Sequence, residues 1–382
     1  MSSVVILTEI IAPYRIPVFN ALARRSDVDV HVIFLSQTDP TSRYWKVYKD
    51  EICFSYEVLP EWRRRLGGYH VLVNWGLSSA LDRVSPEVLV CGGYNYPASW
   101  RALRWAASHR VPFLLWTEST AADRRHKYFH VEYLKRHFFE RCAGFVVPGL
   151  SSLNYVRDLG VTQALTFVAP NAVDNQFFAE KAMLPSGSVT GPRQGLPDRY
   201  FLFVGRLVRE KGVFDLLEAY AKLSPDIRVK VGLVFVGSGR AERELIERSK
   251  AILPGSIQFA GFIQKEELAL TYACADMLVF PTHTDPWGLV VNEAMACGLP
   301  IICTTVAGCA ADLVQDGWNG RVVTPQSVEQ LVEAMNSLAR SPELRSQMGR
   351  HSRERIAHYS PEAWAAGMAA AVTRSRGSLT RG

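Results

Sequence analysis

The sequence predicts an α/β protein built from two doubly wound parallel sheets, and three observations carry that prediction. The chain has 382 residues, which is more than one hydrophobic core usually serves. In both halves, short and nearly continuous apolar runs alternate with amphipathic stretches, as in parallel sheets covered by helices on both faces. Between Ala182 and Asp198 the alternation lapses into a segment rich in Pro, Gly and Ser, which is typical of a linker.

The first half supplies one sheet. Its strands are expected at the apolar runs Val4–Leu7, Val30–Leu35, Val88–Cys91, Phe113–Trp116 and Phe145–Pro148. Helical periodicity lies between several of them, most clearly over Ile16–Arg25 and Ser99–His109. We therefore expect residues 1–180 to form an N-terminal Rossmann-like domain and residues 181–198 to form the linker.

The second half repeats the pattern over residues 199–360. Strands are expected at Tyr200–Gly205, Gly232–Gly237, Ile257–Ala260, Met277–Pro281, Pro300–Cys303 and Arg321–Val323. Helices are expected at Val213–Lys222, Ala241–Ile252, Lys265–Cys274 and Gly288–Cys297. The remaining residues, 361–382, hold an Ala-rich helix that can pack back on the first domain, and a tail. Two such domains place a ligand cleft at the carboxyl ends of their strands.

Composition excludes several classes of protein. Apolar residues make up 48% and charged residues 21%, as in a soluble globular protein, and a net charge of +6 is too small to predict nucleic-acid binding. Seven cysteines at irregular spacing fit reduced core thiols in a cytoplasmic protein better than a zinc site or a disulfide scaffold. No basic residue precedes the apolar run Val4–Leu7, which predicts a buried strand and not a signal peptide, and no apolar stretch could span a bilayer.

The segment from Phe280 to Cys303 carries the strongest chemical signal. It reads as a strand, a polar loop, a helix that opens at Gly288 and a second strand, with Asp285 and Glu293 on either side of the helix start. Free backbone N–H groups and the positive end of the helix dipole suit an anionic ligand there.

Cations and glycines follow other strands of the second half. Arg206 ends one strand and Lys211 precedes the next helix, so both can converge on a diphosphate, although a solvated loop is the competing interpretation. Gly237 lies in a strand-ending V-G-S-G, where a tight turn is the commoner meaning. Phe262 and Ile263 follow another strand and could offer backbone groups to a nucleobase, or simply end that strand.

Four segments, in this order and spacing, resemble the retaining GT-B glycosyltransferases of family four. They are G-R-L-V-R-E-K-G from Gly205, V-G-S-G from Val236, F-A-G-F from Phe259 and D-P-W-G-L-V-V-N-E-A-M-A-C-G-L-P from Asp285. The A-P-N-A-V-D around Pro170–Asp174 and an N-terminal P-Y-R-I-P-V-F-N-A-L extend the resemblance over nearly the whole chain. It implies a GT-B architecture, in which two doubly wound Rossmann-like domains face each other across a cleft.

The resemblance also implies roles for individual residues. Glu293 matches the acid that holds the ribose hydroxyls of the donor nucleotide. Asp285 matches the acid that lies against the donor sugar; the family more often has Glu there, so this position is expected to bear on which sugar fits. Arg206 and Lys211 match the pair that binds the diphosphate. The backbone groups that face the phosphate or the sugar match Gly288, Leu289 and Val290.

The implied reaction is retaining transfer from a nucleotide diphosphate sugar, with a UDP-sugar as the expected donor and no cofactor. The acceptor attacks from the face that the diphosphate leaves, and a donor phosphate oxygen takes its proton. At a distance of about 4 Å and an effective dielectric near 20, the attraction between each cation and the leaving diphosphate is roughly 4 kcal/mol, before the cost of desolvation is subtracted. No Asp-x-Asp motif accompanies the donor segments, so we expect no metal.

The acceptor is then expected in the first half. Tyr14 and Arg15, which follow the first strand, are candidate acceptor contacts, although the glycine pair that many family members carry there is missing. Many relatives place a histidine after the strand Phe113–Trp116. Glu118 is the nearest ionisable candidate here, and a structural loop carboxylate is an equal alternative. His126 lies in A-D-R-R-H-K, which is typical of a solvated basic face.

Two runs mix cations with aromatic residues. Lys135-Arg136-His137 precedes two phenylalanines, and Arg63-Arg64-Arg65 follows Trp62. Such runs can seat a protein on anionic lipid, so peripheral contact with the inner face of the cell membrane is one expectation, and a solvated charged face is the other.

The sequence therefore favours a hexosyltransferase-type enzyme that extends a polysaccharide or a lipid-linked glycan, with the sugar nucleotide and the glycan as its partners and without nucleic acid. Two alternatives stay open. One is a GT-B enzyme with another reaction, such as a nucleotide-sugar epimerase or a phosphorylase-like enzyme. The other is a non-catalytic subunit that binds sugar nucleotides.

Overall fold

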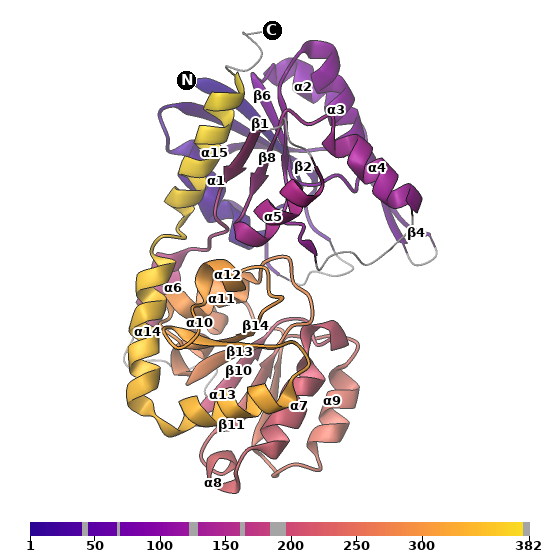
Figure 1. The fold of residues 1–382 in the computed structure, drawn as a ribbon. Coiled ribbons are helices and arrows are strands. Elements are labelled where there is room, and N and C mark those ends of the chain that lie inside the picture. The colour runs from indigo at the N-terminus through magenta and orange to yellow at the C-terminus, as the bar shows by residue number, and fades with distance from the viewer. Residues whose placement is uncertain (40–44, 67–68, 122–128, 161–164, 184–195, 377–382) are drawn as a thin grey trace. The chain divides into compact units, whose positions relative to one another are not determined.

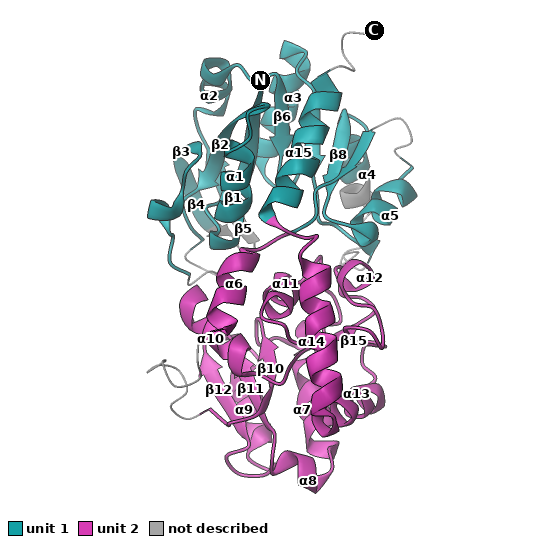
Figure 2. Cartoon of the chain, turned by 90° about the vertical axis from the view of Figure 1, so that its left-hand side faces the viewer, with its two compact units in different colours: residues 1–171, 361–382 teal, residues 172–360 magenta. Residues whose placement is uncertain are grey.

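The chain folds into two compact units, residues 1–171 with 361–382 and residues 172–360 (Figure 2). The computed structural model describes residues 1–39, 45–66, 69–121, 129–160, 165–183 and 196–376. Each unit contains a parallel sheet with helices on both faces (Figure 1). This confirms the predicted class of two α/β units with parallel sheets.

The sheet of unit 1 has the strand order β3-β2-β1-β6-β7-β8-β9. Its strands are β1 (Ser2–Ile10), β2 (Val28–Ser36), β3 (Ser55–Val58), β6 (Val88–Cys91), β7 (Phe113–Trp116), β8 (Gly144–Val147) and β9 (Leu165–Val168). Val4 is in register with Val30 of β2 on one side and with Val88 of β6 on the other. The central strands β6, β7 and β8 are buried along their whole length, which explains their unbroken apolar sequences.

Helices cover both faces of this sheet. They are η1 (Pro13–Arg15), α1 (Ile16–Ala23), η2 (Lys49–Glu51), α2 (Leu77–Val84), α3 (Pro97–His109), α4 (Phe129–Phe139), α5 (Leu150–Asp158) and α15 (Pro361–Arg376). Val5 and Leu7 of β1 belong to the core under α2 and α3. Helix α15 belongs to unit 1, where it packs beside α1 (Figure 1). The C-terminal helix thus completes the core of the first unit.

Trp364 is a buried side chain through which α15 packs into the core of unit 1. It is fully buried, and its ring centroid lies 5.7 Å from that of Phe19 and 5.3 Å from that of Trp116. Trp364→Ala should lower the free energy of unfolding by about 3–5 kcal/mol, because it leaves a large cavity. Glu362→Ala on the same helix removes only an exposed ion pair with Arg24 and is the matched control. Equal urea denaturation midpoints for the two variants would contradict this role.

The sheet of unit 2 has the strand order β12-β11-β10-β13-β14-β15. Its strands are β10 (Tyr200–Val204), β11 (Gly232–Val236), β12 (Ile257–Gly261), β13 (Met277–Phe280), β14 (Ile301–Thr304) and β15 (Gly320–Val323). Side chains alternate along β10: Phe201 and Phe203 enter one core layer, and Leu202 and Val204 enter the layer on the opposite face. The helices around it are α6 (Asn175–Ala182), η4 (Arg209–Lys211), α7 (Val213–Lys222), α8 (Pro225–Arg228), α9 (Glu242–Ser249), α10 (Lys265–Cys274), α11 (Leu289–Ala296), α12 (Ala310–Leu313), α13 (Val328–Arg340) and α14 (Pro342–Ile356).

The structure differs from the sequence expectation at the boundary between the two units and in several peripheral strands of unit 1. Unit 2 begins at Ala172, ahead of the expected linker, and residues 184–195 of that linker lie outside the described residues. Strands β3 and β9 were not predicted, nor was the antiparallel pair β4 (Glu61–Leu66) and β5 (Tyr69–Asn74). None of the described helices is long and apolar enough to cross a membrane.

Candidate functional site

The donor segments meet where the strand order of unit 2 reverses. β10 has β11 on one side and β13 on the other, so the connections that leave β10 and β13 diverge. In parallel α/β sheets such a point forms a crevice at the carboxyl ends of the strands, where ligands bind. The residues after β10, numbers 205–212, and those after β13, numbers 281–288, both follow this edge.

Two glycines let these loops pack against each other. Gly212 has a φ of 67°, and a Cβ there would lie 1.9 Å from the carbonyl oxygen of Pro281. Gly288 has a φ of 98°, and a Cβ there would lie 2.7 Å from the ring of Phe280. Side chains at these two positions would push the loop after β10 away from β13 and move the start of α11. The glycines of the sequence motif therefore set the shape of the crevice.

Lys211 and Asp285 form an ion pair between the loop after β10 and the loop after β13. The Lys211 ammonium also donates to the Thr284 carbonyl at 3.2 Å, and the Trp287 N–H donates to Asp285 Oδ1 at 3.1 Å. The two paired side chains are only 11% and 16% exposed. The structure thus brings together two residues that sequence reasoning assigns to different parts of one donor. It also shows both carboxylate oxygens of Asp285 engaged within the protein.

Arg206 stands at the carboxyl end of β10 and is exposed. Its guanidinium forms no hydrogen bond or ion pair with another described residue. Its charge is one of the causes that hold the pKa of Glu210 below the ordinary value, after a hydrogen bond from the Glu210 backbone and the pairing with Arg240. Arg206 is therefore a cation at the crevice that is available to a ligand.

Glu293 lies on α11, one turn beyond the helix start, and accepts a hydrogen bond from the Tyr272 hydroxyl at 2.8 Å. Burial raises its pKa to about 7, and the bond from Tyr272 opposes that shift. Near neutral pH this carboxylate is therefore poised to ionise when donors such as ribose hydroxyls approach it. Leu289 and Val290 are in the first turn, whose N–H groups lack intrahelical acceptors.

The remaining donor candidates lie on the same edge, one and two strands away from the switch point. Gly237 follows β11 with a φ of 122°, and its N–H donates to the Gly261 carbonyl at 2.7 Å. Phe262 follows β12 and is 41% exposed, whereas Ile263 packs against the core. The structure therefore places the donor candidates predicted from the sequence either after the carboxyl ends of strands of one sheet or in α11, the helix that follows β13.

The acceptor candidates form a second cluster, within unit 1. Arg15 pairs with Glu118, and its guanidinium carbon lies 4.0 Å from the ring centroid of Trp116 and 5.5 Å from that of Tyr14. The ring of Tyr14 in turn meets Trp45 edge-on at 5.7 Å. Loops after β1 and β7 therefore bring Tyr14, Arg15 and Glu118 together. Because Arg15 neutralises Glu118, the cluster combines aromatic surface with a balanced ion pair.

Several cations of the basic runs are engaged by contacts within unit 1. Arg63 points inward and pairs with Asp39 at 2.8 Å. Lys135 is buried, with its ammonium 4.5 Å from the ring centroid of Tyr155, and Arg136 pairs with Glu140 at 2.9 Å. These contacts hold the cations within unit 1. His126 lies outside the described residues.

Metal chemistry has no obvious set of ligands in the described chain. No group of three His, Cys, Asp or Glu side chains is placed there to hold an ion. An Asp-x-Asp sequence does occur at Asp27–Asp29, but Asp27 pairs with Arg25 at 2.8 Å beside the amino end of β2. Metal independence stays a prediction.

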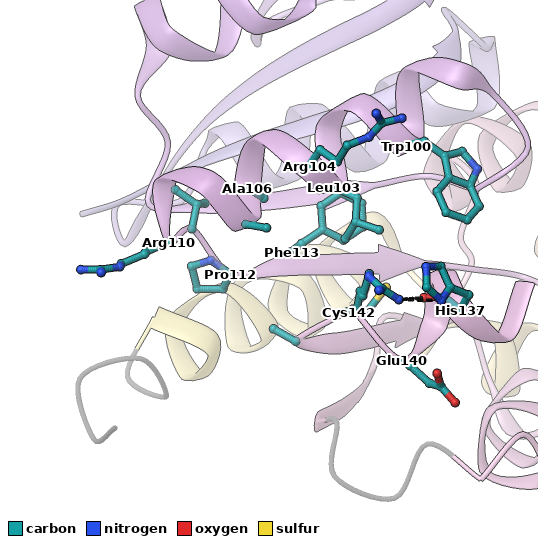
Figure 3. A pocket seen from close by; sticks show the side chains of 14 residues that line it. Trp100, Leu103, Arg104, Ala106, Arg110, Pro112, Phe113, His137, Glu140 and Cys142 are labelled. Carbon is teal, nitrogen blue, oxygen red and sulfur yellow. Dashed lines mark hydrogen bonds between the residues drawn. The ribbon is translucent and has the colours of Figure 1, made fainter. Parts of the chain in front are cut away.

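A hollow of about 700 Å³ lies elsewhere in unit 1, between α3 and α4 (Figure 3). Its lining includes Leu103 and Ala106 of α3, Phe113 at the start of β7, and Cys142. These positions are near the amino ends of the strands. The hollow contains none of the predicted site residues and is not part of the donor edge.

Sequence reasoning missed several residues that support the site. Tyr272 holds Glu293, and the buried side chain of Asn292 accepts from the Trp287 indole N–H at 2.9 Å. His283 contacts Asp215 at 2.6 Å. Only His283 carried a visible signal, since it lies in the polar loop T-H-T-D beside Asp285. The partners of Tyr272 and His283 are distant in sequence, so local patterns could not pair them.

Comparison with known proteins links this geometry to a family. Residues 193–355 match the family described as Glycosyl transferases group 1. The chain is 29% identical over 212 residues to a glycogen synthase of Mycobacterium tuberculosis, covering 55% of this chain and 45% of that one. It is 32% identical over 161 residues to the sulfoquinovosyl transferase SQD2 of Arabidopsis thaliana, covering 41% and 30%. The matched stretches thus span less than half the length of these relatives.

The fold has a solved counterpart. The structure of Anabaena Alr3699/HepE in complex with UDP and glucose superposes with a TM-score of 0.77 at 16% identity, covering 98% of this chain and 100% of that one. A likeness at this identity establishes the fold, and it confirms the expected GT-B class of two doubly wound units.

Proposed function

Residues 193–355 match the glycosyl transferases group 1 family, and on that premise we propose that this chain transfers a sugar from a nucleotide diphosphate sugar to a glycan or lipid-linked glycan. The observation that carries the proposal is the convergence at the β10/β13 switch point. There Arg206, a cation that pairs with no other described residue, lies in the loop after β10 that also carries Lys211, and Lys211 pairs with Asp285 in the loop that leads to α11. These groups match the demands of a diphosphate that gains charge as it leaves.

The proposed roles follow from the contacts. Arg206 and Lys211 bind the diphosphate, with the amides of Leu289 and Val290 beside it. Glu293, oriented by Tyr272, accepts hydrogen bonds from the ribose. Asp285 exchanges its contact with Lys211 for the hydroxyls of the donor sugar, since Lys211 is drawn toward the phosphates.

The reaction we propose retains the anomeric configuration and needs no metal. The bond between the anomeric carbon and the diphosphate breaks, and its electron pair stays on the phosphate oxygen. The acceptor hydroxyl oxygen bonds to the same face of that carbon, and its proton passes to an oxygen of the departing diphosphate. Arg206 and Lys211 stabilise the charge on that leaving group.

We propose a UDP-sugar as the donor, because HepE, which shares the fold, was crystallised with UDP and glucose. For the acceptor we propose the cluster of Tyr14, Arg15 and Glu118, where aromatic rings surround an ion pair.

Product assembly into polysaccharide or another glycoconjugate fits glycan-building relatives such as glycogen synthase. The free thiols of the described chain fit the reducing cytoplasm. Contact with a membrane would need surfaces other than Arg63 and Lys135.

A donor panel tests the function without knowledge of the acceptor. The full chain is incubated with UDP-, GDP- and ADP-sugars, and released nucleotide diphosphate is measured by chromatography. We expect slow hydrolysis of one donor, a UDP-sugar, that accelerates when glycan acceptors are added. Release that ignores every acceptor would favour an epimerase-like reaction, and tight nucleotide binding without any turnover would favour a non-catalytic subunit.

A further inference from the structure

The loop after β13 is held against the turn after β10 by a set of backbone contacts. The His283 N–H donates to the Glu210 carbonyl at 2.9 Å, and the hydroxyl of Thr282 donates to the same carbonyl at 3.2 Å. From the other side, the Thr304 hydroxyl donates to the Thr282 carbonyl at 2.6 Å. Residues 282–285 therefore take their position from neighbouring segments of the crevice.

Two side-chain bridges reinforce this junction. The first is the Lys211–Asp285 ion pair. In the second, His283 Nε2 lies 2.6 Å from Oδ2 of Asp215, with the two side chains 25% and 21% exposed. Asp215 is in the first turn of α7, where the helix dipole favours a negative charge. A short hydrogen bond to a carboxylate is stronger when both side chains are mostly shielded from solvent than when they are exposed. Because the carboxylate accepts, the imidazole must carry its proton on Nε2, which fixes the orientation of the ring.

We expect donor binding to affect the two side-chain bridges differently. Under the proposed function, Lys211 turns its ammonium toward the diphosphate, which weakens its hold on Asp285. The bridge between His283 and Asp215 includes neither Lys211 nor Asp285, so under this proposal it persists. Of the two bridges, it is then the one that still joins the loop 282–285 to the segment that carries Lys211.

We propose that His283 and Asp215 are positioning residues for the donor diphosphate. Their bond keeps the loop 282–285 in register with the turn 209–212 while Lys211 changes partners. Lys211 and Asp285 consequently stay at the distance that lets one reach the phosphate and the other the sugar. The inference rests on the proposed function, because it concerns the same donor site.

This role predicts an effect confined to ligands that engage Lys211. His283→Leu should weaken binding of uridine diphosphate about tenfold, the order expected when one hydrogen bond to a charged group is lost. Binding of uridine monophosphate, which lacks one phosphate, should change much less. His283→Gln, whose amide can still donate to Asp215, should recover most of the affinity.

A double-mutant cycle separates positioning from a general loss of stability. Calorimetric titrations of the full chain with both nucleotides would compare His283→Leu, Lys211→Met and the double variant. We expect His283→Leu to have no further effect on diphosphate affinity once Lys211 is replaced. His351→Ala is the matched control, since it removes a histidine stacked on Trp318 in the same unit but outside the crevice. It should leave both affinities unchanged.

The results distinguish this inference from the function on which it rests. Equal losses for both nucleotides, an unchanged diphosphate affinity in His283→Leu, or a full additional loss in the Lys211→Met background would overturn the positioning role. A wild-type chain that binds no nucleotide diphosphate would instead contradict the proposed function.

Discussion

Arg206→Ala is expected to lower the rate of sugar transfer by about 10²–10³-fold, the usual consequence of removing one group that stabilises developing charge. The side chain is exposed and makes no ion pair with another described residue, so its loss should leave the melting temperature unchanged. Transfer is measured with the donor that the panel selects, as nucleotide diphosphate released in the presence of acceptor.

Arg209→Ala provides the matched control for this variant. Arg209 lies in the same turn, but its guanidinium pairs with Glu244 and covers the ring of Phe214 at 4.3 Å. It should retain activity, although it loses packing. Undiminished turnover in Arg206→Ala would exclude this cation from the reaction, and equal losses in both variants would indicate a nonspecific charge effect.

Glu293→Gln is expected to abolish most nucleotide binding and to remove its pH dependence. Burial raises the pKa of this carboxyl to about 7, and the ionised form is the stronger acceptor for the ribose hydroxyls that we propose it binds. Wild-type affinity for a nucleotide diphosphate sugar should therefore rise about tenfold from about pH 6 to about pH 8, as the ionised fraction grows. The glutamine variant should bind weakly at every pH. A flat wild-type profile would contradict the role of Glu293.

The same shift has a consequence for stability. Because the pKa of Glu293 is higher in the folded than in the unfolded chain, its contribution is fully present below the ordinary value of 4.5 and is lost as the pH rises through about 7. Glu293→Gln should therefore make the nucleotide-free chain more stable than the wild type at about pH 8. Loss of binding together with gained stability is the signature of a functional carboxylate.

The central strands of both sheets are predictable from the sequence because they are apolar along their whole length. The edge elements escape prediction for physical reasons. Leu165 and Val168 of β9 are largely exposed, so this strand lacks a buried pattern. In β4, Arg63 points inward and pairs with Asp39. The run of basic residues in this strand therefore lacks the alternation of apolar and polar residues by which a hairpin is predicted. Where tertiary contacts position a strand without a buried apolar pattern, the local sequence gives little signal for it.

The location of the proposed donor site is predictable from the sequence, but the contacts between its residues are not. Glycines and charges at strand ends indicate the carboxyl edge of the second sheet, because parallel strands bring their carboxyl ends to one edge. The partners could not be predicted, because Lys211 and Asp285 lie on different connections, as do Asp215 and His283. The motif around Asp285 indicates a contact with a sugar by resemblance. It does not predict that Asp285 pairs with Lys211 in the ligand-free chain, because Lys211 lies on another connection.

Hydrogen exchange of the full chain with and without uridine diphosphate tests the central claim most directly. If the nucleotide binds at the β10/β13 switch point, amides of residues 205–212 and 282–293 should exchange more slowly in its presence, and those lining the hollow between α3 and α4 should not change. Arg206→Ala should abolish the protection at the same nucleotide concentration. Protection confined to unit 1, or protection that survives in the variant, would contradict binding at this switch point.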